Sequence, residues 1–144
     1  MSTTASIDAD RAHMHPIVEL RIRADPGQLP VLRAVAAAIT LQHDFDLDAV
    51  ADVKLAVDEA ATRLIMSAVD GAELTCRFQA ITPALRISLS TTTRPSPSGG
   101  STRTFGWHVL NSLADSVDVR VDDTPSGDTV TTIDLSVTEG SALR

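Results

Sequence analysis

The chain is poor in cysteine and in aromatic residues, with one Cys, one Trp, three Phe and no Tyr among 144 residues. A single cysteine, Cys76, excludes an intramolecular disulfide and any metal site built from several cysteines. This usage is typical of the reducing cytosol. The sequence also lacks a basic and then apolar leader and any apolar run near the ~20 residues that a membrane span requires. We therefore expect a soluble, cytoplasmic protein with an aliphatic core and no metal site.

Basic residues are also in deficit, since 12 Lys and Arg stand against 19 Asp and Glu, for a net charge of -7. This charge opposes binding to nucleic acid or to an anionic membrane. Hydrophobic residues make up 43% of the chain, which at this length suffices for one domain with its own core. We expect a flexible tail over residues 1–15, a single domain over 16–138 and a second tail over 139–144.

The longest periodic stretch covers residues 47–69, where apolar side chains recur at steps of three and four. This spacing predicts a helix with one buried stripe. Glu59 and Arg63 fall outside the stripe and lie one turn apart on the same flank. Two interpretations stay open at this point. The pair is either an ordinary ion pair, worth ~0.3 to 0.5 kcal/mol if exposed, or it includes a carboxylate placed for chemistry.

Alternating apolar and polar residues predict strands on both sides of that helix. A Pro, Ser and Gly-rich stretch over residues 91–104 predicts a long loop of the kind that forms lids or binding loops. The pattern as a whole predicts an α/β (α+β) two-layer sandwich, with helices on one face of a mixed, mostly antiparallel sheet. The expected strands are 18–22, 74–80, 85–89, 117–121 and 131–137, and the other helices are 28–41 and 105–114.

Residues 58–63 read DEAATR, and residues 110–119 read LNSLADSVDV. These motifs resemble the small bacterial anti-sigma factors that double as serine-protein kinases, of the RsbW and SpoIIAB type. The likeness covers about residues 17–137. It implies the Bergerat-type (GHKL) ATPase fold that histidine kinases and gyrase share.

The resemblance also implies roles for the helix residues. In the family, the glutamate that matches Glu59 is the general base, and the asparagine four residues later holds Mg²⁺ beside the γ-phosphate. This sequence has Arg63 at the second position. Arginine has only donors and is always charged, so it cannot ligate a cation as an amide oxygen does. The resemblance therefore implies weak or absent kinase chemistry, with Mg²⁺ coordination in question.

The other two nucleotide-binding motifs of the family are degenerate in this sequence. Thr91, Thr93 and Pro95 stand where the family has an aspartate and two glycines. By resemblance, ATP or GTP remains the implied cofactor. The alternative to magnesium is that Arg63, Arg94 and Arg103 bind the phosphates directly. The residues implied in nucleotide binding are Arg63, Thr91, Gly100, Arg103, Gly106 and Thr129.

The function that the resemblance implies is an anti-sigma factor. Such a protein binds an alternative sigma factor of RNA polymerase and is released by an anti-anti-sigma partner of the STAS type, often as a homodimer. By resemblance the contact lies on residues 28–40, through Leu29, Arg33 and Ala37, and Arg33 is shared between the two partners. The alternative is an active serine-protein kinase or NTPase that phosphorylates its antagonist. A sensor acting through Cys76 or His108 is a third possibility.

Overall fold

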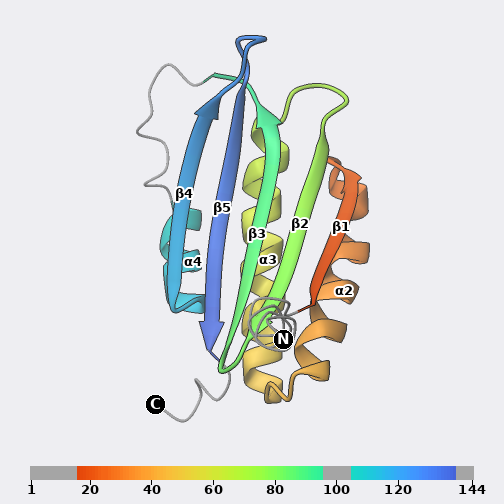
Figure 1. The fold of residues 1–144 in the computed structure, drawn as a ribbon, viewed down its shortest axis with the longest axis vertical. Helices are drawn as coiled ribbons and strands as arrows, with labels where there is room; N and C mark the ends of the chain where they lie inside the picture. Colours follow the sequence, from red (N-terminus) through yellow and green to blue (C-terminus); the bar gives the residue numbers. More distant parts are fainter. Residues whose placement is uncertain (1–15, 96–104, 139–144) are drawn as a thin grey trace, which may run out of the picture.

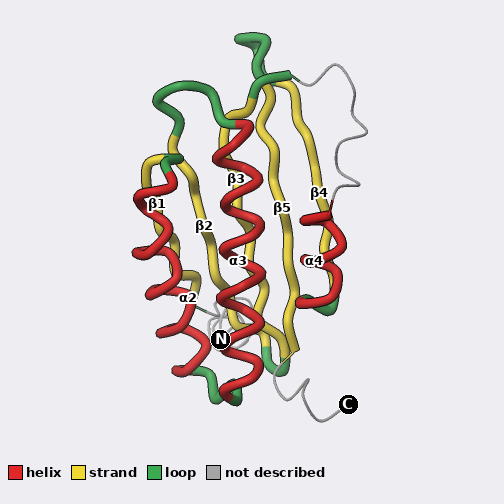
Figure 2. The backbone as a smooth tube through the Cα atoms, turned by 180° about the vertical axis from the view of Figure 1, so that it is seen from behind, coloured by secondary structure: helices red, strands yellow, loops and turns green. Residues whose placement is uncertain are grey.

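A five-stranded sheet carries three α-helices on one face in the computed structural model, which describes residues 16–95 and 105–138 (Figure 1). Seen from the helix side, α2, α3 and α4 lie next to one another across the sheet (Figure 2). The predicted two-layer fold is therefore confirmed. The elements in chain order are β1 (Ile17–Arg23), the 3-10 turn η1 (Pro26–Gln28), α2 (Leu29–Gln42), α3 (Leu47–Ser67), β2 (Glu73–Ile81), β3 (Ala84–Thr93), α4 (Phe105–Leu113), β4 (Ser116–Asp123) and β5 (Thr129–Thr138).

The strand order is β1-β2-β3-β5-β4, so the last strand lies inside the sheet, between β3 and β4. All four pairings are antiparallel. The expected parallel component of the sheet is therefore absent from the described residues. The reason is that each hairpin, β2 with β3 and β4 with β5, is antiparallel, and the two hairpins join through the antiparallel pair β3 and β5.

Local signals set the ends of the two long helices. Pro30 lies in the first turn of α2, where its missing N–H costs nothing. Asp46 caps α3, since its carboxylate accepts a hydrogen bond of 2.7 Å from the Ala49 amide. At the other end, Ala68 turns into an extended conformation and bridges to Thr93 at the end of β3. The C-terminal turn of α3 is thereby fixed next to the end of the β3–β5 pair.

The core is aliphatic, as the composition predicts. It lies between the sheet and the buried stripe of α3, with Leu32 of α2 and Leu110 of α4 fully buried on either side. Cys76 is buried in the same cluster, and Phe78 is the largest fully buried side chain. Among the described residues, no helix is both long enough and apolar enough to span a bilayer.

The end of β3 differs from the prediction. Residues 91–93 were expected to begin the long loop, but Thr91 and Thr93 continue the strand and pair with Thr131 and Thr129 of β5. The reason is tertiary, because a partner strand some 40 residues further along supplies the hydrogen bonds that the local sequence does not announce. The remainder of the expected loop, together with the expected tails over 1–15 and 139–144, lies outside the described residues.

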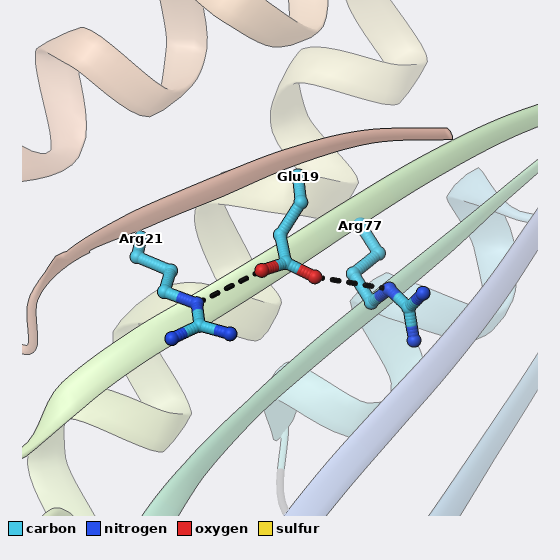
Figure 3. A network of polar contacts seen from close by, with 3 residues as sticks. All are labelled: Glu19, Arg21 and Arg77. Atoms are coloured by element: carbon cyan, nitrogen blue, oxygen red, sulfur yellow. Dashed lines mark hydrogen bonds and ion pairs between the residues drawn. The ribbon is translucent and has the colours of Figure 1, made fainter. Parts of the chain in front are cut away.

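The face of the sheet opposite the helices is polar. Glu19 accepts from Arg21 on its own strand at 2.8 Å and contacts Arg77 on β2 at 3.3 Å (Figure 3). On the other half of the sheet, Arg120 of β4 reaches Asp134 of β5 at 3.2 Å. On this outer sheet face, these charged side chains are thus paired with one another within the chain.

Candidate functional site

A cavity of about 440 Å³ lies between the C-terminal half of α3, the beginning of α4 and the neighbouring ends of β3, β5 and β4. We call it the threonine pocket. Its apolar walls come from Leu64, Trp107, Val119 and Ile133, and Arg63 and Arg94 also line it. Its polar residues include Thr93, Thr129 and Thr131. A cavity with apolar walls, a few grouped polar atoms and nearby cations is the usual form of a small-ligand site.

The three threonines form a hydrogen-bonded cluster across β3 and β5. The Thr93 hydroxyl lies 2.7 Å from the hydroxyl of Thr129 and 2.7 Å from that of Thr131. The Thr129 hydroxyl also donates to the Thr93 carbonyl oxygen at 3.2 Å. Because the register places residues 93 and 131 on the same face of adjoining strands, the cluster follows directly from the sheet topology.

The helix pair Glu59 and Arg63 lies next to this pocket. Arg63 Nη1 is 3.8 Å from Glu59 Oε2, a long contact between side chains that are 24% and 32% exposed. Arg63 lines the threonine pocket, whereas Glu59 is not among its lining residues. The cation, not the carboxylate, therefore faces the cavity.

The residues predicted to bind nucleotide fall in different places. Arg63 and Thr129 line the threonine pocket. Thr91 is buried, and its hydroxyl donates to the Glu73 carbonyl at 2.8 Å, so it does not line the pocket. Gly106 belongs to the first turn of α4, and Gly100 and Arg103 lie outside the described residues.

Several lining residues of the pocket were missed as site residues, Thr131 and Trp107 among them. Thr131 was predicted only as a strand residue, although its two-residue spacing from Thr129 places both on one face. Trp107 was predicted only as part of a helix, and no local signal marks it as a wall of the cavity. Both contributions depend on which elements pack together, which the sequence alone does not give.

Magnesium does not fit the residues present. The lining of the threonine pocket includes one carboxylate, from Asp123, and the described residues hold no group of three or more His, Cys, Asp or Glu side chains able to bind a metal ion. Mg²⁺ prefers oxygen ligands in octahedral geometry. At the position implied for its amide ligand, Arg63 brings a fixed positive charge that repels a cation.

A second candidate site is the outward side of α2. Its exposed residues Val31, Ala34, Ala38 and Leu41 recur at steps of three and four, and we call them the α2 apolar face. Val31 is 46% exposed and Leu41 is 55% exposed. Arg33 is the only charged residue of this helix. Figure 2 shows α2 alongside α3 on the helix side of the sheet.

Arg33 is held in place by a contact with the neighbouring helix. Its Nε donates to Asp58 Oδ1 of α3 at 2.7 Å, and the two side chains are 44% and 31% exposed. The other predicted contact residues of α2 are less accessible. Leu29 is only 8% exposed and packs in the core, and Ala37 is half-buried. Leu29 therefore supports the helix from beneath, and the outward surface of α2 is formed by Arg33 and the α2 apolar face.

Cys76 and His108 offer little for a sensor. The Cys76 side chain is fully buried, and burial raises the pKa of its thiol to about 12, so the reactive thiolate is strongly disfavoured. His108 is exposed on α4. Neither residue lines the threonine pocket.

A family model described as a histidine kinase-like ATPase domain matches residues 22–133. This range includes the buried helix, the threonine pocket and four of the five strands in full or in large part. The chain belongs to this family. Within it, the likeness is to the RsbW type, because the sequence is 41% identical over 102 residues to two proteins named anti-sigma-F factor RsbW, from the CDC 1551 / Oshkosh and H37Rv strains of Mycobacterium tuberculosis.

That alignment covers 69% of this chain but only 59% of each relative, so the chain spans about three-fifths of the length of the curated relatives it matches. A crystal structure of the RsbU and RsbW domains of a Mycobacterium tuberculosis protein superposes with a TM-score of 0.59. It covers 86% of this chain and 32% of that one, at 13% sequence identity. At this identity the superposition supports the fold and not the function.

Proposed function

We propose that the protein is an anti-sigma factor, which binds and inhibits an alternative sigma factor of RNA polymerase and is released by an anti-anti-sigma protein of the STAS type. The likeness to proteins named anti-sigma-F factor RsbW supports this role. The structural observation that carries the proposal is the α2 apolar face. It leaves Val31 and Leu41 exposed on a helix whose only charge is Arg33.

Apolar side chains gather on the outside of the helix layer. Contiguous exposed apolar surface of this kind is typical of protein–protein contacts in soluble proteins. An arginine among small apolar residues is a common interface hot spot, and Arg33 is held in one orientation by Asp58. Of the described residues of α2 and α3, the large apolar ones that are exposed are Val31, Leu41, Leu47, Leu55 and Met66.

Competition between two partners for one surface explains how release would work. A STAS protein that contacts Arg33 would occupy part of the sigma-binding surface, so the two complexes would exclude each other. We also propose a homodimer, as the family resemblance implies. Analytical ultracentrifugation of the free protein and of each complex measures both the dimer and the exclusion.

The test of the proposed function is transcription in vitro with purified components. Adding the protein to RNA polymerase carrying the cognate alternative sigma factor should abolish transcription from that sigma factor's promoters and leave the housekeeping sigma factor unaffected. Adding the STAS antagonist should restore transcription. Failure to bind any alternative sigma factor encoded by the same genome would contradict the proposal.

The alternative function is an active serine-protein kinase that uses Glu59 as general base. One observation weighs against it, since Arg63 rather than Glu59 lines the threonine pocket. Incubation of the protein with its antagonist and labelled ATP decides the matter. Phosphoserine that appears with the native chain and is lost in Glu59→Gln would establish the kinase.

Nucleotide binding is a separate part of the proposal. We place an ATP or GTP molecule in the threonine pocket, with the base between the apolar walls and the phosphates toward the arginines that line it. Membership of an ATPase domain family supports this assignment, as do the volume and lining of the cavity. Nucleotide at about 100 times its dissociation constant should raise the melting temperature by roughly 5 to 10 °C.

A further inference from the structure

The lining of the threonine pocket has a charge opposite to that of the molecule as a whole. The chain carries a net charge of -7, but Arg63 and Arg94 both line the cavity, against one carboxylate, Asp123. Arg94 contacts Asp70 at 3.7 Å, and that carboxylate is fully exposed and well solvated. The two arginines therefore give an anion approaching from solvent a local attraction at this cavity.

Arg63 is placed to meet such an anion. It stands on the C-terminal half of α3 and lines the pocket, and its Nη1 lies 3.8 Å from Glu59 Oε2. A guanidinium binds phosphate through two parallel N–H donors and stays charged at every physiological pH. It can therefore neutralise phosphate oxygens without any metal ion.

The threonine cluster suits a ring that carries N–H donors. One proton assignment uses all three hydroxyls of the cluster: Thr131 donates to Thr93, Thr93 donates to Thr129, and Thr129 donates to the Thr93 carbonyl oxygen. This leaves the acceptor lone pairs of Thr131 open. Thr131 lines the pocket, and so do Trp107 and Ile133. An amino-bearing purine satisfies both the acceptor and the apolar walls.

We propose that this pocket binds a purine nucleoside polyphosphate without magnesium, with Arg63 and Arg94 in place of the metal ion against the phosphates and Thr131 accepting from the base. The inference rests on the nucleotide binding proposed above. It adds a departure from the metal-dependent chemistry that the family resemblance implies. It also explains why a donor-only side chain can occupy a position where an amide oxygen is expected.

The test is titration calorimetry of the full chain with ATP, ADP and GTP, each in excess Mg²⁺ and in excess EDTA. The affinity of the native chain should be equal in the two buffers. Arg63→Ala should weaken binding in both buffers by about 10-fold to 100-fold, the loss expected for one charged hydrogen-bonding group. Arg63→Asn should bind weakly in EDTA and regain affinity in Mg²⁺, because the amide restores a metal ligand.

Matched controls separate the possible outcomes. Arg77→Ala removes an arginine of the outer sheet face, which is 54% exposed against 24% for Arg63, and should leave binding unchanged. Circular dichroism and melting of each variant establish that it is folded. Thr131→Val should weaken purine nucleotides more than inorganic triphosphate, since only the base contact is lost.

The failures are distinguishable. If the native chain binds no nucleotide in either buffer, both the proposed nucleotide pocket and this inference are refuted. The proposal of sigma-factor binding is not affected by that result. If the native chain binds only with Mg²⁺, or if Arg63→Ala binds as tightly as the native chain, nucleotide binding stands and the metal-free mode is refuted.

Discussion

The two broad faces of the molecule differ in how they satisfy their side chains. On the outer sheet face, Glu19 contacts both Arg21 and Arg77, so charges are paired within the chain. On the helix face, Val31 and Leu41 of α2 are about half exposed, and no partner within the described residues covers them. The sheet face is suited to water, whereas the helix face leaves apolar surface that association would bury.

The comparison teaches where to look for recognition in this fold. A charged face whose ion pairs are mostly exposed contributes little to stability. An exposed apolar face lowers solubility, and in soluble proteins such a face commonly marks a binding surface. The following variants are chosen to break or to sharpen this contrast.

The largest effect is expected at the centre of the α2 apolar face. Ala38→Glu would bury an unpaired carboxylate in the sigma-factor complex, so the dissociation constant should rise by at least about 100-fold. The melting temperature should change by less than about 3 °C, because Ala38 is exposed in the free protein. Biolayer interferometry with the immobilised sigma factor measures the affinity. Arg86→Glu, which reverses a charge on the outer sheet face, is the matched control, and an equal loss there would remove the distinction between the faces.

A smaller effect is expected from Arg33→Ala, which removes the only charge of α2. Affinity for the sigma factor and for the STAS antagonist should each fall by about 10-fold, the loss of one charged hydrogen bond. Asp58→Asn keeps the arginine but removes the charged partner that orients it. The affinity of this variant for both partners should lie between that of the native chain and that of Arg33→Ala. The same interferometry assay ranks the three proteins. Unchanged affinity for both partners in Arg33→Ala would exclude Arg33 as their shared contact.

The buried core between the two faces, which contains Cys76, is tested by unfolding the protein at two pH values. Burial raises the pKa of the Cys76 thiol from 9.0 to about 12, so between these values the unfolded chain loses the proton and the folded chain keeps it. The contribution of the Cys76 thiol to the free energy of unfolding is fully present below pH 9. It declines as the pH rises, by up to ~1.4 kcal/mol per pH unit. Urea unfolding at pH 8 and pH 10 should show a smaller loss for Cys76→Ala than for the native chain. Parallel losses in both proteins would mean that water reaches the thiol.

The smallest effect is expected on the outer sheet face. Arg77→Ala removes a contact with Glu19 between side chains that are 54% and 34% exposed. The free energy of unfolding should fall by less than about 1 kcal/mol, and the difference should shrink further at high salt. Urea unfolding at two ionic strengths measures both. A loss above 2 kcal/mol would show that this face carries more stability than its exposure allows.

Periodicity predicted the fold because the elements are strongly patterned. The buried stripe of α3 and the cap at Asp46 can both be read locally, and both are present. The alternation in β1, β2 and β5 likewise follows from one buried face. The end of β3 could not be predicted, because Thr91 and Thr93 depend on pairing with β5 rather than on neighbours in sequence.

The candidate sites were only partly predictable for the same reason. Arg33, Arg63 and Thr129 were singled out by the family resemblance. The rotation of α2 against the sheet decides that Leu29 is buried while Ala38 is exposed, and that rotation is fixed by packing. Trp107 joins the threonine pocket only because α4 packs beside α3, which no local pattern reveals.

The insertion of β5 between β3 and β4 has a consequence for biosynthesis. The floor of the threonine pocket joins Thr93 to hydroxyls 36 and 38 residues later, so a nascent chain arrested before Thr129 has no such cavity. Until β5 emerges from the ribosome, the edge of β3 is an open template for other strands. Binding of a ligand in this pocket would therefore report that synthesis has passed β5.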